Sequence, residues 1–163
     1  MSLKEKIKED LKKAMKEKRE IEVSTLRLLS DAIFNKEREK RYRIFNQRKG
    51  LNENELEKES ELSDDEIIEV IFSEIKKREE AILEFERGGR EDLAEKEKKE
   101  IGILKKYLPE QLSEKEIKEI AKETIEKIGP NFGAVMKEVM SKVKGKAEGS
   151  RVSKIVKELL SQK

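Results

Sequence analysis

The stretch from Leu62 to Ile67 reads LSDDEI and contains the features of a helix start. Ser63 occupies the position of an N-cap, and Glu66 follows three residues later, the spacing at which their side chains and backbone amides bond reciprocally. An apolar residue stands on each side of this pair, as a hydrophobic staple requires. The stretch from Leu112 to Ile117 reads LSEKEI and repeats the pattern. Each stretch therefore predicts that a helix begins immediately after its serine.

Apolar residues after these starts recur every three or four positions, which is the spacing of one helical face. Stripes of the same period occur near both ends of the chain, and the residues expected to point inward include Ile7, Met15, Leu26, Phe34 and Val135. Only two prolines and eight glycines interrupt 163 residues, and no stretch shows the alternation of a strand. Although 47% of the residues are charged, acids and bases are interspersed, so the sequence predicts an all-α fold of about seven helices.

Pro109 marks the expected division of the chain. A proline cannot continue a helix, and it biases the preceding residue away from helical dihedral angles. We expect an N-terminal domain of long helices over residues 1–109 and a C-terminal domain of three helices over residues 110–163. Residues 46–61 are polar, include Gly50 and lack a sustained period, so we expect them to form a long loop.

The residue types that are missing exclude several classes of chemistry. Without cysteine there is no disulfide, thiolate metal site or cysteine nucleophile, and without histidine there is no serine–histidine triad. A serine–lysine dyad could be built on Ser24, Ser73 or Ser141, but the chain lacks the Gly/Ser-rich loop that such amidases use. We therefore expect no catalytic residue, no metal site and no cofactor.

The distribution of apolar residues also bears on where the protein works. No apolar run approaches the roughly 20 residues that cross a bilayer. The first ten residues read MSLKEKIKED and are charged where a signal peptide would be apolar. These features predict a soluble, cytoplasmic protein that does not bind membranes.

A basic turn near the C-terminus is the main candidate for a binding site. Residues 133–163 hold eight basic and three acidic side chains, although the whole chain has a net charge of only +2. Glycines there would let a phosphate backbone approach, and the next helix start would offer free amides to an anion. The candidate nucleic-acid ligands are Lys142, Lys144, Gly145, Lys146, Gly149, Arg151 and Lys154. The structural alternative is a solvated helix face with two glycines that only shape the turn.

A second basic segment covers residues 36–49, with seven basic and two acidic side chains. Tyr42, Ile44 and Phe45 lie among these charges, and such a mixture could hold single-stranded nucleic acid by stacking. Isolated aromatic residues more often pack against a core, however. We therefore expect these three side chains to fold back onto the protein at a fraying helix end.

The segment from Gly88 to Asp92 contains a glycine pair before a helix start. It lacks the glycine spacing and the Lys-Ser/Thr ending of a phosphate-binding P-loop. We expect a corner between two helices, in which Arg90 and Asp92 form a local ion pair.

Five short motifs complete the pattern. They are LRLL at Leu26–Leu29, GREDL at Gly89–Leu93, YLPEQL at Tyr107–Leu112, GAVM at Gly133–Met136 and KGKAEG at Lys144–Gly149. In this order they resemble the GatB/YqeY family over residues 3 to 160. The chain looks like a stand-alone YqeY-like protein, whose C-terminal module is similar to the tail of the GatB component of the tRNA-dependent amidotransferase.

The resemblance implies a role in binding and does not imply a catalysed reaction. In the amidotransferase the tail module is associated with holding tRNA, whereas transamidation belongs to other domains and subunits. The expected role is a non-catalytic tRNA-binding or accessory module, with tRNA and a translation-related protein as partners. One alternative is an adaptor that docks on an amidotransferase. Another is a carbon–nitrogen ligase with glutamine as amide donor, a label that stand-alone members often carry.

Two positions depart from the family pattern. Glu148 stands where the family usually has aspartate, which is a better N-cap than glutamate. The connection around residues 41–61 also looks longer than usual, so no family function is transferred to it.

Overall fold

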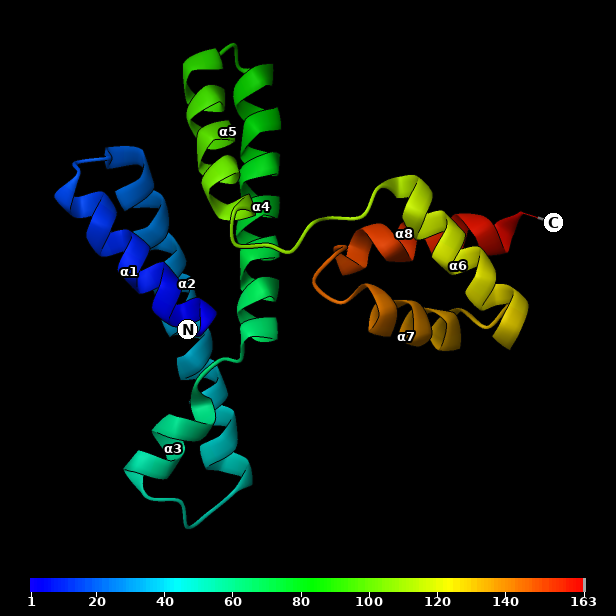
Figure 1. Cartoon of the computed structure of the whole chain (residues 1–163), viewed down its shortest axis with the longest axis horizontal. Coiled ribbons are helices and arrows are strands. Elements are labelled where there is room, and N and C mark those ends of the chain that lie inside the picture. Colours follow the sequence, from blue (N-terminus) through cyan, green and yellow to red (C-terminus); the bar gives the residue numbers. More distant parts are fainter. Residues whose placement is uncertain (163) are drawn as a thin grey trace. The chain divides into compact units, whose positions relative to one another are not determined.

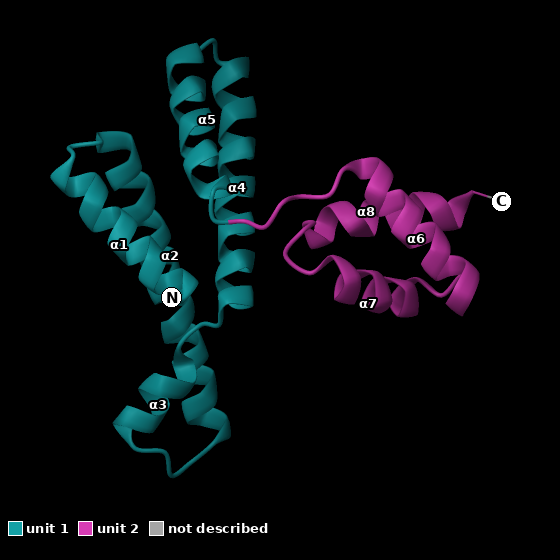
Figure 2. Cartoon of the chain, viewed as in Figure 1, with its two compact units in different colours: residues 1–107 teal, residues 108–163 magenta. Residues whose placement is uncertain are grey.

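The computed structural model describes residues 1–162, which form eight α-helices (Figure 1). Within these residues no strand is present, and the predicted all-α class is confirmed. The chain divides into two compact units, one from Met1 to Tyr107 and one from Leu108 onward (Figure 2).

The first unit contains two helical hairpins and one short helix. Its helices are α1 (Leu3–Lys16), α2 (Glu20–Gln47), α3 (Glu53–Ser60), α4 (Asp64–Arg87) and α5 (Glu91–Lys105). Helix α1 packs against α2, α4 packs against α5, and α2 also contacts α4 and α5. Fully buried aliphatic side chains fill the space between them, among them Ile7, Leu26, Leu29, Ile67, Ile71 and Leu104.

The predicted helix starts are confirmed by reciprocal capping bonds. Ser63 Oγ accepts a hydrogen bond from the Glu66 amide at 3.2 Å, and the Glu66 carboxylate accepts one from the Ser63 amide at 3.2 Å. The same pair of bonds joins Ser113 with Glu116 at the start of α6. Capping chemistry therefore sets where α4 and α6 begin.

The predicted loop over residues 46–61 is wrong. Helix α2 continues to Gln47, and α3 follows after a short connection. Asn52 caps α3, because its Oδ1 accepts a hydrogen bond from the Glu55 amide at 2.8 Å. Leu56 is buried, and α3 contacts α2. Leu56 is the one apolar residue among the eight of this helix, so no periodic stripe could reveal it.

Two predictions about inward-pointing residues are also wrong, because Met15 is 48% exposed and Phe34 is 60% exposed. The buried residues of α2 include Leu29 and Ile33, which define its inner face. Phe34 follows Ile33 directly, and one residue rotates a side chain by about 100° around a helix. An apolar side chain at that position therefore points away from the core.

A buried arginine ties α4 to α5. The Arg78 side chain is only 7% exposed and donates hydrogen bonds to the carboxylates of Glu74 at 3.0 Å and Glu100 at 3.2 Å. Glu97 lies 3.9 Å from the same guanidinium. Burial raises the pKa of the Glu97 carboxyl, and its hydrogen bond with Glu100 raises this pKa further. Three carboxyl groups thus share one buried cation.

The second unit is a three-helix domain formed by α6 (Glu114–Ile128), α7 (Phe132–Val143) and α8 (Gly149–Ser161). Its core consists of small and branched aliphatic side chains, which include Ile117, Ala121, Val135, Val139, Val152 and Val156. Gly129 ends α6 at φ +90°, a backbone conformation that favours glycine.

Candidate nucleic-acid interface

The turn between α7 and α8 holds most of the residues that the sequence proposed as nucleic-acid ligands. The Lys146 amide donates to the Val143 carbonyl at 2.7 Å, which closes the turn. Gly145 has φ +76° and is buried, and its carbonyl accepts a hydrogen bond from Gln111 Nε2 at 2.8 Å. Gly145 therefore shapes the turn, and its backbone does not provide the open approach that the sequence suggested for a phosphate.

Gln111 and Leu112 hold this turn in place. The Leu112 amide donates to the Lys146 carbonyl at 2.8 Å, and the Leu112 carbonyl accepts a longer bond of 3.5 Å from Arg151. Sequence reasoning missed the role of Gln111 as a second anchor. Both residues belong to the YLPEQL motif, and their partners Gly145 and Lys146 belong to the KGKAEG motif. The structure therefore brings these two motifs into contact.

The basic side chains of this region differ in availability. Lys144, Lys146, Arg151 and Lys154 are exposed, and the last two lie one turn apart on α8. Lys142 is 38% exposed and turns toward neighbours within the unit, because its ammonium lies 4.0 Å from Glu138 and 3.5 Å from Thr124 Oγ1. All five predicted cations are thus exposed, although Lys142 and Arg151 also have partners within the unit.

The start of α8 lacks the usual compensation for its positive end. Glu148 is the N-cap residue, but its side chain accepts a hydrogen bond from Ser150 Oγ at 2.8 Å and caps no helix amide. The first turn of α8 contains no acid and includes Arg151. A Cβ on Gly149 would lie 3.8 Å from Met140 Cε, an ordinary contact, so packing does not require glycine there. The amides and dipole of this helix start favour an anion.

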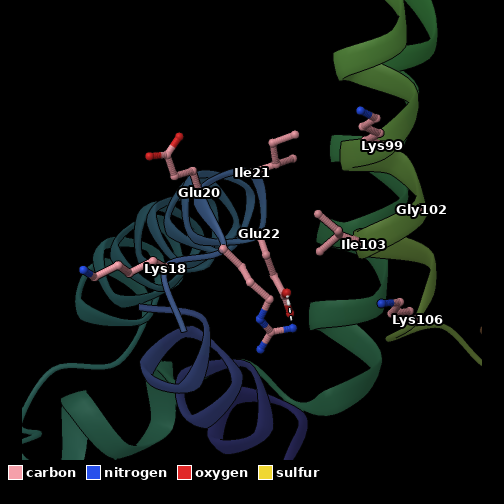
Figure 3. Close-up of a pocket in the computed structure, with 9 residues that line it drawn as sticks. Lys18, Glu20, Ile21, Glu22, Lys99, Gly102, Ile103 and Lys106 are labelled. Carbon is pink, nitrogen blue, oxygen red and sulfur yellow. Dashed lines mark ion pairs between the residues drawn. The ribbon is translucent and has the colours of Figure 1, made fainter. Parts of the chain in front are cut away.

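A cleft of about 710 Å³ lies in the first unit, between the start of α2 and α5 (Figure 3). Ile21 and Ile103 contribute apolar surface to it, and Lys99 and Lys106 lie along its α5 side. Within residues 1–162 no carboxylate pairs with either of these lysines. Gly102 lies in the last turn of α5, where a Cβ would meet no atom within 4 Å. The cleft therefore combines an apolar surface with two available cations.

The corner at Gly89 has the structural role that the sequence predicted. Gly89 has φ +73° and follows the end of α4. Arg90 and Asp92 form an ion pair at 3.3 Å, and the hydrogen bond from Arg90 lowers the pKa of the Asp92 carboxyl. The predicted ion pair is confirmed.

Two of the serines considered for a serine–lysine dyad have local partners. Ser24 Oγ donates to the Ile21 carbonyl at 3.0 Å, and Ser141 Oγ donates to the Glu138 carbonyl at 2.7 Å. Among residues 1–162, no cluster of three acidic side chains has a geometry that could hold a metal ion. In the same range no helix is both long and apolar enough to cross a membrane.

Comparison with known proteins places the chain in a family. The family model described as Yqey-like protein matches residues 4–160. Altered inheritance of mitochondria protein 41, a mitochondrial protein of Pyrenophora tritici-repentis, is 30% identical over 160 residues, which cover 94% of this chain and 78% of that protein. An uncharacterized protein of Schizosaccharomyces pombe is 43% identical over 51 residues, which cover 31% of this chain and 42% of that protein. Because one relative is mitochondrial, the cytoplasmic location remains a prediction. The match of the family model extends from the first helix to the last, and the chain therefore belongs to the YqeY-like protein family.

Proposed function

We propose that this protein is a non-catalytic accessory module that binds tRNA through the turn between α7 and α8. One observation carries the proposal: Lys144, Lys146 and Arg151 are exposed around a helix start that no side chain caps and whose first turn contains no acid. A phosphate group at this position would satisfy the free amides of α8 and would lie among the three cations. The resemblance to the amidotransferase tail supports tRNA as the RNA class.

The packing of α8 supports this orientation. Val152 and Ile155 are buried in the core of the second unit, so the opposite side of the helix faces solvent. Gln111 and Leu112 hold the turn through hydrogen bonds, which limits the conformational entropy that binding would cost. The cations are therefore carried on a rigid element rather than on a free loop.

Binding of bulk tRNA across a salt series tests the proposal. The variant combines Lys144→Gln, Lys146→Gln and Arg151→Gln, which removes three candidate phosphate contacts. Each such contact releases counterions, so the slope of log K against log salt should become shallower by about 2 to 3. A control variant with Lys115→Gln, Lys122→Gln and Lys127→Gln removes the same charge from exposed positions on α6 and should keep most of the slope.

Two results of the tRNA experiment would contradict the proposal in different ways. If the wild type binds tRNA and the turn variant keeps its affinity and slope, this turn is not the RNA site. If the wild type does not bind tRNA at any salt concentration, the RNA-binding function itself fails.

The cleft beside α5 favours a second candidate function, an adaptor that docks on a protein. Glycine within a helix is about 1 kcal/mol less favourable than alanine, yet Gly102 stands in the last turn of α5, where a Cβ would meet no atom within 4 Å. A partner side chain that packs against this bare backbone would account for the glycine. Titration calorimetry with a purified tRNA-dependent amidotransferase, in the absence of RNA, would detect such docking. Gly102→Trp should abolish the heat of binding if the cleft is the contact.

A further inference from the structure

Helix α2 exposes a face that combines arginine with aromatic residues. We call it the α2 stripe, and it consists of Arg27, Phe34, Arg38, Arg41, Tyr42 and Phe45. Steps of three, four and seven residues return to the same side of a helix, so these positions share one face. Phe34 is 60% exposed, Tyr42 72% and Phe45 62%, and the expectation that Tyr42 and Phe45 fold back onto the core is wrong.

The charges of the stripe are available to a ligand. The Arg38 guanidinium lies 5.9 Å from the centre of the Phe34 ring, a cation–π distance. In residues 1–162, no carboxylate pairs with Arg27 or Arg41. The segment from Arg27 to Phe45 holds three acids. Glu37 and Glu39 have partners, because Lys4 binds Glu37 at 2.9 Å and Lys36 binds Glu39 at 3.1 Å. Asp31 is exposed on the same face as the stripe, four residues after Arg27, and it is the one acid among the arginines and aromatic rings there.

This exposure has no explanation in the packing of the first unit. The chain has five phenylalanines, two tyrosines and no tryptophan, and three of these seven rings lie on the α2 stripe. Grouped exposed apolar side chains mark interaction surfaces, and arginine and aromatic residues are the ones enriched there.

The charge and the shape of the α2 stripe together identify its ligand. Guanidinium groups without a carboxylate partner can bind the phosphates of a ligand by ion pairing. Exposed aromatic rings can stack on the bases of a ligand, which are also flat. Phe34 and Phe45 are eleven residues apart, which corresponds to about 16 Å along the helix. A stacked strand rises about 3.4 Å per nucleotide, so the rings cover about five nucleotides. The α2 stripe ends before Arg48, which forms an ion pair with Glu59 of α3.

We propose that the α2 stripe binds unpaired nucleotides of RNA. Bases stack on the rings of Phe34, Tyr42 and Phe45, and the arginines contact phosphates. This site lies in the first unit and goes beyond the tRNA contact proposed for the second unit. An acidic segment of a protein would satisfy the arginines, but it would not use three flat rings, which is why RNA is the favoured ligand.

A single-stranded RNA octamer that contains 2-aminopurine provides the test. Stacking on an aromatic ring should quench the fluorescence of this base when the wild type is added. The variant Phe34→Leu, Tyr42→Leu, Phe45→Leu keeps apolar side chains and a helix-forming residue at each position. Because each stacked base is worth about 1–3 kcal/mol, this variant should bind at least tenfold more weakly and quench little.

Two controls keep the test specific. Phe132→Leu removes a ring in the second unit that lies 5.5 Å from Lys157, and it should leave octamer binding unchanged. A second variant, Arg27→Gln with Arg41→Gln, should retain quenching at low salt and show a slope shallower by about 1.4, since the coefficient for single strands is about 0.7 per contact.

The outcomes are separable from those of the tRNA experiment. The turn variant with Lys144→Gln, Lys146→Gln and Arg151→Gln should still quench the octamer, even if it no longer binds tRNA. An octamer that the wild type does not quench would overturn the proposal, as would equal quenching by the leucine variant. Displacement of the octamer by poly-glutamate at equal charge concentration would assign the stripe to an acidic protein instead.

Discussion

Glu148 shows how one side chain can leave a helix start incomplete. Its carboxylate bonds to the Ser150 hydroxyl, while the first amides of α8 receive no side-chain cap. Aspartate is shorter by one methylene group and is among the preferred N-cap residues, whereas glutamate is not. This chain therefore carries a weaker cap than aspartate would provide at the helix start proposed to bind phosphate.

Glu148→Asp should therefore stabilise the protein. The aspartate can accept from an amide of the first turn of α8, and such caps are worth about 0.5–2 kcal/mol. We expect a gain of about 0.5–1 kcal/mol in the free energy of unfolding, measured with urea. Glu119→Asp, at an exposed site within α6, serves as the control and should bring no gain. An unchanged midpoint for Glu148→Asp would mean that the α8 amides are already satisfied.

Glu97 gives a pH-dependent prediction. Burial raises the pKa of its carboxyl above the ordinary 4.5, with Glu100 as a further cause, so the folded protein favours the protonated form. The contribution of the Glu97 carboxyl to the free energy of unfolding is fully present below pH 4.5, where the group is protonated. It is lost as the pH rises through the raised pKa, because the charged form is disfavoured in the folded protein. At pH 7 the charged form of Glu97 destabilises the folded protein, although attraction to Arg78 offsets part of this effect.

Glu97→Gln should consequently raise the melting temperature at pH 7, with a gain below about 1 kcal/mol because the site is partly solvated. The difference from the wild type should shrink as pH falls below 4.5, where both side chains are neutral. Melting curves between pH 3.5 and about pH 7 check this trend. A variant that is less stable than the wild type at pH 7 would show that attraction to Arg78 outweighs the cost of burying Glu97.

At the scale of elements, Arg78 connects α4 and α5 more firmly than an exposed ion pair could. Its removal would leave the carboxylates of Glu74 and Glu100 buried without a cation. Arg78→Met should therefore cost about 3–5 kcal/mol of stability, in line with other buried charge pairs from which one partner is removed.

The same helix provides the control for this prediction. Arg87 forms an exposed pair with Glu84 near the end of α4, and both side chains are more than 70% exposed. Arg87→Met should change the free energy of unfolding by less than about 0.5 kcal/mol. Equal effects of the two substitutions in urea denaturation would mean that Arg78 contributes no more than a surface charge.

The elements also show which parts of the fold the sequence could predict. The starts of α4 and α6 were predictable because a capping box is local chemistry, complete within four residues. Helix α3 has a capping box too, at Asn52 and Glu55, but its single buried leucine provides no period. The capping pair was the signal that could have revealed this helix.

The candidate binding surfaces also include features that the local sequence could predict and features that it could not. The basic turn was predictable because Lys144, Lys146 and Arg151 are close in sequence. The bond from Gln111 to Gly145 spans 34 residues and leaves no local signal. For the aromatic residues of α2, spacing predicts that they share a face but not whether a neighbouring helix covers it. That depends on tertiary packing, and the structure leaves this face exposed.

For the whole molecule, charge is nearly balanced, and this affects how RNA binding can work. With 39 basic and 37 acidic residues, the net charge of +2 provides little general attraction for a polyanion. Any affinity must then come from local groups such as the basic turn and the α2 stripe. Binding that depends on such groups should respond to a few substitutions and to salt, as the experiments above assume.

The division into two compact units suggests that the second unit can fold by itself. The sequence predicts a boundary at Pro109, and this remains a prediction until fragments are tested. The unit that begins at Leu108 has its own aliphatic core, and Gln111 and Leu112 bond to the turn before α8. Small three-helix domains of this size can be stable alone, although with little margin.

We expect a fragment of residues 108–163 to show a helical circular dichroism spectrum and a cooperative thermal transition. A fragment of residues 113–163 keeps the capping box of α6 but lacks both Gln111 and Leu112, which is partly buried against the core. Its stability should fall by about 2 kcal/mol, from one lost apolar contact and the lost hydrogen bonds to the turn. Equal melting temperatures would show that these two residues do not hold the turn. A longer fragment without a cooperative transition would show that the second unit depends on the first, since its own core would then be too small to offset the entropy of folding.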